Sequence, residues 1–328
     1  MPVCHFILEM EKNMFYRLTA DYILRGWDNM SWTLVKRPKN KIIKLNQEQF
    51  QVLTLCDGET ELPNSLLDKR LRKALQQCEA EGWIEPCKEP RPLKDDQYYR
   101  YYNNRCVECV LWSVTGRCNF RCRHCYVDGP DGKMGELSTE QAFDFIDQMA
   151  ACGVLRVDIT GGEPLVRKDF WQLIDRILSY KMTIGQFYTN GWLVDETVIE
   201  GFEKRGLKPD VQVSFDGAGW HDWMRGINGA EKAALKAMQL FENHNFRTNA
   251  AMCIHKGSMH SVPETIKALN EIGIKELRVS TIEMTDLWSK NCDGNDLTLQ
   301  EYFEGMIPYI TWYYQNERPI EHLGLGCI

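Results

Sequence analysis

The sequence predicts an α/β fold built on a parallel sheet, preceded by a smaller domain rich in strands. From Val110 to Thr281, short apolar stretches alternate with amphipathic helical stretches, which is the rhythm of βα units. Up to about residue 95 that rhythm is absent, and residues 87–105 are polar and charged, with Pro90 and Pro92. The expected parts are a first domain over 1–95, a linker over 96–109, the α/β domain over 110–285 and a helical extension over 286–328.

The first domain reads as a small winged-helix-like unit, with short strands before helices. A turn at Pro38–Asn40 separates two of the strands, and Asn46 is placed as the N-cap of the first helix. The predicted strands are Tyr22–Arg25, Ser31–Val35 and Lys41–Leu45, and the predicted helices run from Asn46 to Leu55 and from Ser65 to Ala80.

Six strands are expected in the α/β domain, each but the last followed by a helix. They are Val110–Thr115, Arg156–Thr160, Thr183–Thr189, Asp210–Ser214, Arg247–Ile254 and Glu276–Thr281. Such a series forms either an open doubly wound sheet or a barrel, complete or not, and the pattern does not separate the two.

Composition narrows the class of protein. Hydrophobic residues make up 44% and charged residues 26% of the 328, as in a folded globular chain. The net charge of −7 gives no reason to expect a nucleic-acid partner, and no apolar run approaches the roughly 20 residues of a membrane span. The chain has 13 cysteines and no signal peptide, so we expect a cytoplasmic protein whose cysteines bind metal or react.

The most informative segment follows the first of these strands, where Cys118, Cys122 and Cys125 are spaced Cys-x3-Cys-x2-Cys. A 4Fe-4S cluster normally takes four thiolates, so three would leave one iron open for catalysis. Two alternatives remain open, namely unliganded cysteines and a zinc site with His124 as fourth ligand. Cys106 and Cys109, spaced Cys-x2-Cys, have the spacing of half a metal site but no second pair nearby.

This loop resembles the signature of the radical S-adenosylmethionine (radical SAM) superfamily, Cys-x3-Cys-x-aromatic-Cys, with His124 at the aromatic position and Tyr126 after it. The resemblance implies a partial (β/α)6 barrel of the TIM type. It also implies a 4Fe-4S cluster on the three cysteines and SAM on the open iron, with reductive cleavage giving a 5′-deoxyadenosyl radical.

Further motifs follow successive strands in the order of that superfamily. Thr160–Leu165 resembles the GGEP motif, so Gly161, Gly162 and Glu163 are expected to bind the SAM amino group. Tyr188–Gly191 is similar to the TNG element and places Asn190 near SAM, while Ser214–Gly217 is similar to S-x-D-G, with Ser214 on the ribose. His221, Asp222 and Arg225 resemble the HD…R stretch of peptide-modifying members.

The two ends of the chain resemble parts of enzymes that modify ribosomally made peptides (RiPPs). The first domain is similar to the RiPP recognition element, which would bind the leader of a precursor peptide; packing, dimerisation or DNA binding are the other roles of such a domain. Cys327 could begin a truncated SPASM or twitch domain with auxiliary iron–sulfur clusters.

The resulting functional prediction is a radical SAM peptide maturase that takes electrons from a flavodoxin or ferredoxin and needs neither nucleic acid nor membrane. The alternatives are a radical SAM maturase of another enzyme or of a cofactor pathway, and a non-catalytic iron–sulfur adapter that binds peptides. No catalytic base or radical relay can be named from the sequence.

Overall fold

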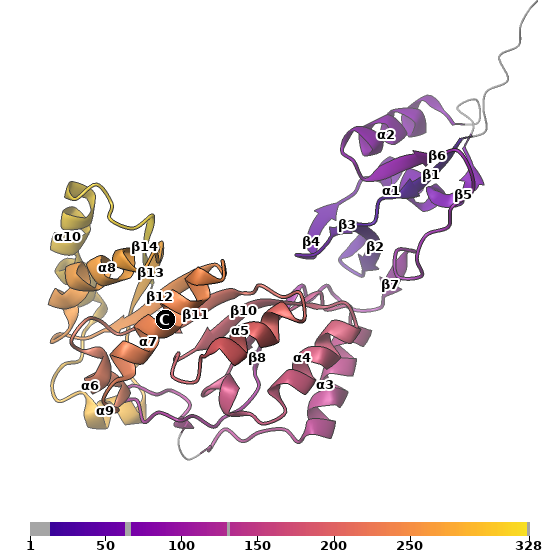
Figure 1. Cartoon of the computed structure of the whole chain (residues 1–328). Helices are drawn as coiled ribbons and strands as arrows, with labels where there is room; N and C mark the ends of the chain where they lie inside the picture. Colours follow the sequence, from indigo (N-terminus) through magenta and orange to yellow (C-terminus); the bar gives the residue numbers. More distant parts are fainter. Residues whose placement is uncertain (1–13, 63–66, 130–131, 327–328) are drawn as a thin grey trace, which may run out of the picture. The chain divides into compact units, whose positions relative to one another are not determined.

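The computed structural model describes residues 14–62, 67–129 and 132–326, and it divides into two compact units (Figure 1). The first unit comprises residues 1–108 with 148–155, and the second comprises 109–147 with 156–328. Each is described on its own below.

The first unit contains two small sheets and two helices. In strand order, one sheet is β5 (Asp57–Glu61), β1 (Phe15–Leu18) and β6 (Ile84–Cys87), and the other is β4 (Lys41–Lys44), β3 (Met30–Lys36), β2 (Tyr22–Trp27) and β7 (Arg100–Tyr102). Helices α1 (Gln47–Leu55) and α2 (Lys69–Ala80) contribute Val52, Leu53 and Leu75 to the same buried core as Leu24 and Leu34.

The helix starts in this unit follow their capping residues. Asn46 caps α1 as predicted, and Gln49 completes a capping box with it. The predicted start of the second helix at Ser65 lies outside the described residues; α2 begins at Lys69, where the Asp68 carboxylate accepts hydrogen bonds from the backbone N–H groups of Arg70 and Leu71.

The segment expected as a linker over 96–109 contributes a strand to the first unit. Strand β7 pairs in parallel with β2, from Arg25 opposite Arg100 to Trp27 opposite Tyr102. The polar composition of this segment concealed a short aromatic run, Tyr98–Tyr102, of the kind that strands favour.

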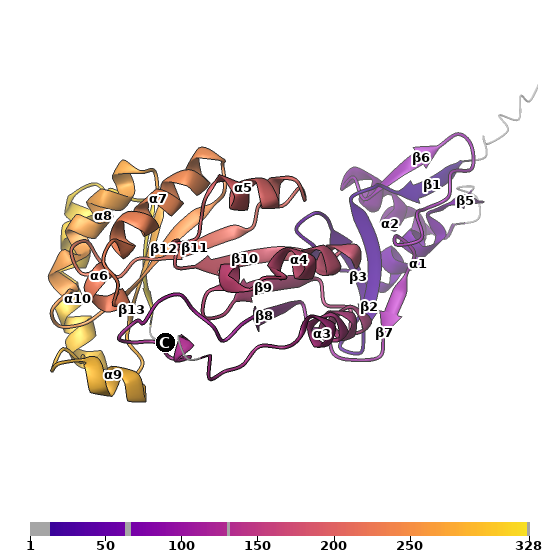
Figure 2. The same ribbon diagram turned by 60° about the horizontal axis from the view of Figure 1, so that its bottom comes forward.

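The second unit is a parallel sheet of seven strands that lie side by side in chain order (Figure 2). They are β8 (Cys109–Ser113), β9 (Arg156–Thr160), β10 (Thr183–Thr189), β11 (Asp210–Ser214), β12 (Thr248–Ile254), β13 (Glu276–Thr281) and β14 (His322–Gly326). Within the part of the chain that the structure describes, strands β8 and β14 pair on one side only, so the predicted α/β fold with an incomplete barrel is confirmed.

The seventh strand, β14, was not among the six predicted strands. It pairs with β13 from His322 opposite Glu276 to Gly326 opposite Ser280. Gly324 and Gly326 give this stretch little intrinsic preference for a strand, and pairing with β13 overrides that preference. The predicted helical extension contains α9 (Asp286–Asn291) and α10 (Leu299–Gln315).

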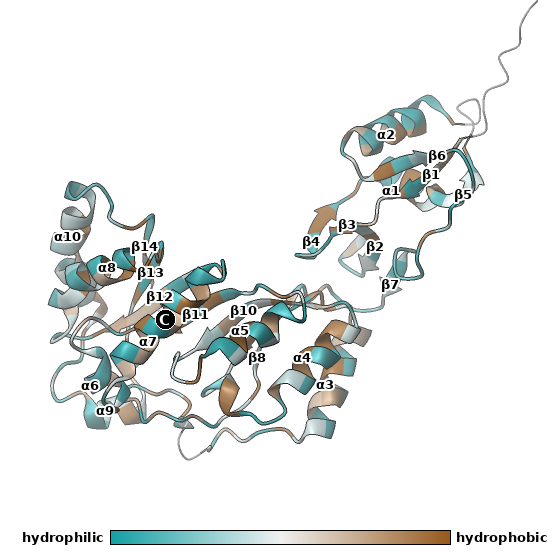
Figure 3. Cartoon of the chain, in the orientation of Figure 1, coloured by the Kyte–Doolittle hydropathy of each residue, from teal (hydrophilic) through white to brown (hydrophobic). Residues whose placement is uncertain are grey.

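One face of the sheet is apolar and packs against helices. Val157, Val211, Leu277 and Val279 are completely buried, and α4 packs on β10 while α7 packs on β11 and β12. The helices are amphipathic, and teal and brown stretches both occur along α3 and α4 in Figure 3. The helices of this unit are α4 (Phe170–Ser179), α5 (Glu196–Glu203), α6 (His221–Arg225), α7 (Ala230–Asn243), α8 (Val262–Glu271), α9 and α10, together with residues 139–147 of α3 (Thr139–Ala151), whose last residues belong to the first unit.

A buried arginine ties together the ends of the first two strands of this sheet. Arg167 donates through Nη1 to the Val114 carbonyl at 2.6 Å and through Nη2 to the Leu137 carbonyl at 3.0 Å. Its Nε lies 2.7 Å from Asp169 Oδ1, and Asp169 in turn accepts a hydrogen bond from Thr139. The cysteine-bearing loop leaves the sheet beside this network.

We expect Arg167→Met to lower the free energy of unfolding by about 3 kcal/mol, because it leaves two carbonyls and a carboxylate without their buried cation. The matched control is Arg176→Met, since the Arg176–Asp147 pair is also bidentate but both side chains are more than a third exposed. Its loss should cost about 1 kcal/mol or less. Urea denaturation of both variants measures the difference, and equal losses would contradict the assigned role of Arg167.

Candidate metal and cofactor site

The predicted site residues gather where the first four parallel strands end. In a parallel sheet the carboxyl ends of all strands lie along one edge, so the loops that follow them become neighbours. The loop after β9 hydrogen-bonds directly to the loop after β8: Gly162 N–H donates to the Thr115 carbonyl and Glu163 N–H donates to the Arg117 carbonyl, both at 2.9 Å.

The two glycines of the β9 loop are needed for this close approach. A Cβ on Gly161 would lie 2.6 Å from the Thr115 carbonyl oxygen, and one on Gly162 would lie 2.2 Å from the Arg117 carbonyl oxygen. Both distances are far below van der Waals contact. The Gly-Gly pair therefore lets the cysteine loop sit directly on the end of β9.

The three predicted ligands share one small apolar cluster. Cys122 is buried and Cys118 and Cys125 are partly buried, and they pack with Phe120, Ile227 and Ala230. Backbone N–H groups point at two of the sulfurs: Phe120 N–H donates to Cys118 Sγ and Gly129 N–H donates to Cys125 Sγ, each at 3.4 Å. Such donors stabilise thiolates that bind metal.

Without a metal ion, Cys118 and Cys122 hold their protons at neutral pH. Burial raises the pKa of Cys118 to about 11, and burial also raises the pKa of Cys122. A bound metal centre supplies positive charge that stabilises buried thiolates, so its binding releases the thiol protons. An iron–sulfur cluster fits this donor set of three converging, mostly apolar thiols.

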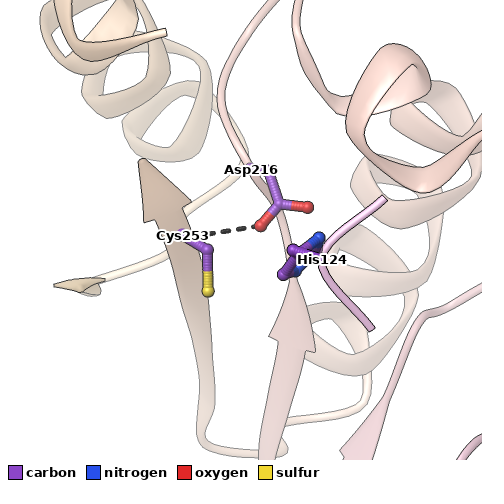
Figure 4. Close-up of side chains that lie close together, drawn as sticks. All are labelled: His124, Asp216 and Cys253. Carbon is purple, nitrogen blue, oxygen red and sulfur yellow. Dashed lines mark hydrogen bonds between the residues drawn. The ribbon is translucent and has the colours of Figure 1, made fainter. Parts of the chain in front are cut away.

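The zinc alternative with His124 as fourth ligand is not favoured by the geometry. Thiolates on one tetrahedral zinc lie about 3.8 Å apart, because each Zn–S bond is about 2.3 Å. Among the described residues, one set of potential metal-ligand atoms lies within 4.8 Å of one another, and these atoms belong to His124, Asp216 and Cys253. None of the three loop cysteines is in this set. His124 therefore faces the β11 and β12 ends, where Figure 4 shows it beside Asp216.

In the set formed by His124, Asp216 and Cys253, the carboxylate of Asp216 is already paired with the Arg225 guanidinium. Asp216 is fully buried, its Oδ2 lies 2.6 Å from Nε of Arg225, and its Oδ1 accepts from the Cys253 N–H at 3.1 Å (Figure 4). Burial alone would raise the pKa of Asp216, but the charges of Arg225 and of the neighbouring histidines outweigh it and hold the pKa far below its usual range. We assign no metal ion to these residues.

Glu163 is a buried carboxylate of the opposite kind. It accepts hydrogen bonds from the Asn190 N–H at 2.7 Å and from Thr189 Oγ1 at 3.0 Å, and no ion pair joins it to a cation in the described part of the chain. Burial raises its pKa to about 7, against the effect of those hydrogen bonds. A ligand ammonium group is the partner that this carboxylate lacks, so SAM fits the site.

The remaining predicted SAM-binding residues, Asn190, Ser214 and Tyr126, differ in their contacts and in their exposure. Asn190 donates through Nδ2 to Asn119 Oδ1 at 2.8 Å and to Cys118 Sγ at 3.8 Å, so it fastens the cysteine loop. Ser214 is the last residue of β11 and is partly buried. The side chain of Tyr126 is 68% exposed.

The two cysteines of the Cys106-x2-Cys109 pair belong to different units. Cys106 packs with Trp27 and Ile23 in the first unit, whereas Cys109 belongs to the second unit, where its thiol lies 3.2 Å from Asp158 Oδ2. Cys327 lies outside the described residues. None of the described helices is long and apolar enough to cross a membrane.

Sequence reasoning missed the role of Asp216. It singled out the His221, Asp222 and Arg225 stretch only as a motif, and it treated Asp216 as part of the S-x-D-G pattern. The available signal was the eight-residue interval from Asp216 to Arg225, in which an acid at a strand end is followed by a short helix that ends in a base.

Comparisons with known proteins agree with this geometry. The profile of the Radical SAM superfamily matches residues 112–281. Mycofactocin maturase MftC of Mycobacterium tuberculosis is 38% identical over 59% of this chain and 50% of its own length. PqqA peptide cyclase of Granulibacter bethesdensis is 30% identical over 66% of this chain and 62% of its own. This chain spans roughly half to two thirds of the length of these curated relatives.

Solved structures share the fold. Streptococcus suis SuiB bound to the precursor peptide SuiA covers 95% of this chain and 73% of its own, with a TM-score of 0.68 at 14% identity. The enzyme anSMEcpe with bound AdoMet and a peptide covers 66% of this chain and 63% of its own, with a TM-score of 0.55 at 18% identity.

The raised pKa of Glu163 predicts a pH dependence of stability. The folded protein holds a proton on Glu163 up to about pH 7, whereas the unfolded chain releases it near 4.5. Stability therefore falls as pH rises through this window, by up to about 3 kcal/mol at 1.36 kcal/mol per pKa unit. Glu163→Gln removes the titration, so its loss of stability between about pH 5 and about pH 8 should be smaller than that of the wild type. Urea denaturation at both pH values measures this, and parallel losses would refute it.

Proposed function

This chain belongs to the radical SAM superfamily, and from that premise we propose that it matures a ribosomally synthesised precursor peptide. The observation that carries the proposal is the first unit: the structure of SuiB bound to the precursor peptide SuiA covers 95% of this chain and so includes that unit. The curated relatives MftC and PqqA peptide cyclase are named as a maturase and a peptide cyclase.

The cofactors of this superfamily are a 4Fe-4S cluster and SAM. Cys118, Cys122 and Cys125 would hold three irons of the cluster and leave the fourth for SAM. Glu163 would pair with the SAM ammonium group, Gly161 and Gly162 would let the ligand approach the backbone, and Ser214 and Asn190 border the same strand ends. When bound, the cluster supplies the electron that cleaves SAM into a radical able to abstract hydrogen from a substrate carbon.

A peptide leader would bind the first unit by extending a sheet. Among the described strands, β4 has only β3 as neighbour, so its other edge offers backbone N–H and C=O groups to an extended peptide. The neighbouring strand β3 contributes Trp32 to an aromatic group: Trp32 stacks on Phe50 with ring centroids 5.7 Å apart, and Tyr99 packs edge-on against Phe50 at 4.8 Å. Trp32 and Tyr99 remain more than a third exposed, as anchors for peptide side chains would be.

A cofactor-pathway enzyme is the second candidate function, because Fe-coproporphyrin III synthase of Methanosarcina barkeri is 31% identical over 58% of this chain. The two candidates differ in whether a peptide is consumed. We further propose that the enzyme works in the cytoplasm with a flavodoxin or ferredoxin as electron donor, since the eleven described cysteines are all unpaired.

Radical SAM chemistry at this site predicts that the anaerobically reconstituted protein forms 5′-deoxyadenosine from SAM and dithionite. Cys125→Ala should lose cluster iron and at least about a hundredfold in this activity, because two thiolates cannot replace three. Cys152→Ala is the matched control, since Cys152 is exposed and outside the cysteine loop. Liquid chromatography of the product measures both. A wild type that carries about four irons yet forms no 5′-deoxyadenosine would instead support the non-catalytic adapter.

Peptide maturation predicts that Trp32→Ala weakens binding of a precursor peptide by about tenfold, the equivalent of about 1.4 kcal/mol. SAM cleavage without peptide should stay unchanged. Tyr101→Ala is the control, because Tyr101 is similarly exposed but hydrogen-bonds to Asp28 instead of joining the aromatic group. Fluorescence titration measures the affinity, and mass spectrometry detects the modified peptide. An enzyme that leaves every such peptide unchanged but consumes a porphyrin would favour the cofactor pathway.

A further inference from the structure

We propose that Arg225, held in place by Asp216, donates a hydrogen bond to the sulfur of Cys122 and thereby raises the reduction potential of the cluster. This inference rests on the proposed role of Cys122 as a cluster ligand. Arg225 would be a positioning residue that acts on the cluster through Cys122 without touching the reacting atoms.

The contact is built from a buried ion pair. Arg225 Nη1 lies 3.7 Å from Cys122 Sγ, and Arg225 Nε lies 2.6 Å from Asp216 Oδ2. The Asp216 side chain is fully buried and the Arg225 side chain is only 12% exposed. The guanidinium therefore bridges a carboxylate and a prospective cluster thiolate, with little water to screen its charge.

Asp216 is itself rigidly fixed. Its Oδ1 accepts a hydrogen bond from the Cys253 N–H of β12 at 3.1 Å, and its own backbone N–H donates to His221 Nδ1 at 2.8 Å. The His221 ring stacks on Phe215, with centroids 5.2 Å apart and an interplanar angle of 21°. The carboxylate that anchors Arg225 is thus held by two strands and by α6.

The short helix α6 is also fastened to the cysteine loop, which limits the movement of Arg225 relative to Cys122. Arg123 N–H donates to the Met224 carbonyl at 2.8 Å. Gly226 has φ of 69°, and a Cβ there would lie 2.6 Å from the Arg121 carbonyl oxygen. The residues on either side of Arg225 therefore press directly against the loop that carries Cys122.

A cation at this place acts on the reduction potential in a definite direction. Reduction adds one negative charge to the cluster, and a nearby, poorly screened positive charge with a hydrogen bond to sulfur stabilises the reduced form. Removing it leaves Asp216 as an uncompensated negative charge, which acts in the same direction. Loss of Arg225 should therefore make the cluster harder to reduce.

Arg123 provides a matched control in the same loop. Its guanidinium donates to the Trp223 and Asn291 carbonyls and pairs with Asp293, and none of these contacts is to a cysteine. Arg123→Gln removes a positive charge from the loop without removing a hydrogen bond to a sulfur. Arg225→Lys, in turn, keeps the charge beside Asp216 but loses the planar fork that reaches Cys122.

The experiment is a redox titration of the reconstituted proteins without SAM, followed by electron paramagnetic resonance of the reduced cluster, with iron content measured in parallel. In Arg225→Gln we expect the ratio of reduced to oxidised cluster at a fixed potential to fall at least tenfold, a shift of 59 mV for one electron. Arg225→Lys should fall between this variant and the wild type, and Arg123→Gln should match the wild type.

The outcomes separate this inference from the proposed function. A wild type without a 4Fe-4S signal would overturn the assignment of the cluster and the inference with it. Normal clusters with wild-type potentials in both Arg225 variants would overturn the inference alone. If Arg225→Gln does not hold a cluster, the test rests on Arg225→Lys, since this variant keeps the ion pair. A wild-type reduction potential in Arg225→Lys would then overturn the inference. Loss of the cluster from both variants, when both are folded, would also overturn it.

Discussion

The site depends on two backbone hydrogen bonds between neighbouring strand ends, from Gly162 and Glu163 to the carbonyls of Thr115 and Arg117. They form only because Gly161 and Gly162 have no Cβ to collide with the cysteine loop. With the loop seated there, the three cysteines meet in one apolar cluster and Glu163 becomes fully buried. Both the proposed metal site and the proposed SAM site therefore depend on one close backbone approach.

The electrostatics of the site rest on two buried carboxylates with different partners. Asp216 has Arg225 beside it and a pKa far below its usual range, so it is a permanent anion that fixes a cation in place. Glu163 has hydrogen-bond donors but no cation, and burial raises its pKa to about 7. A carboxylate paired within the protein is structural, whereas one without a cation is ready for a cationic ligand. In the proposed function, this difference is the reason for placing SAM on the side of Glu163 and cluster tuning on the side of Asp216.

The two units divide the work of the proposed peptide maturase. The parallel sheet brings the chemistry-bearing loops to one edge, as barrels of this kind require. The first unit offers an unpaired strand edge and a partly exposed aromatic group, which are features of peptide binding rather than of catalysis. Strand β7 is the edge strand of the four-stranded sheet and pairs with β2. It comes from the segment that the sequence suggested was a linker, so this part of the segment is integrated into the first unit.

The sequence by itself determined the α/β class, six of the seven parallel strands and the order of the motifs at their ends, because periodicity and spacing are local properties of the chain. It did not reveal β14 or β7, whose residues become strands only by pairing with β13 and β2. It also could not show that Asp216 and Arg225 converge on Cys122, or that His124 turns away from the loop cysteines toward Asp216. Those relations join residues about a hundred positions apart, and only the packing of strand ends and of α6 against the cysteine loop sets their distances.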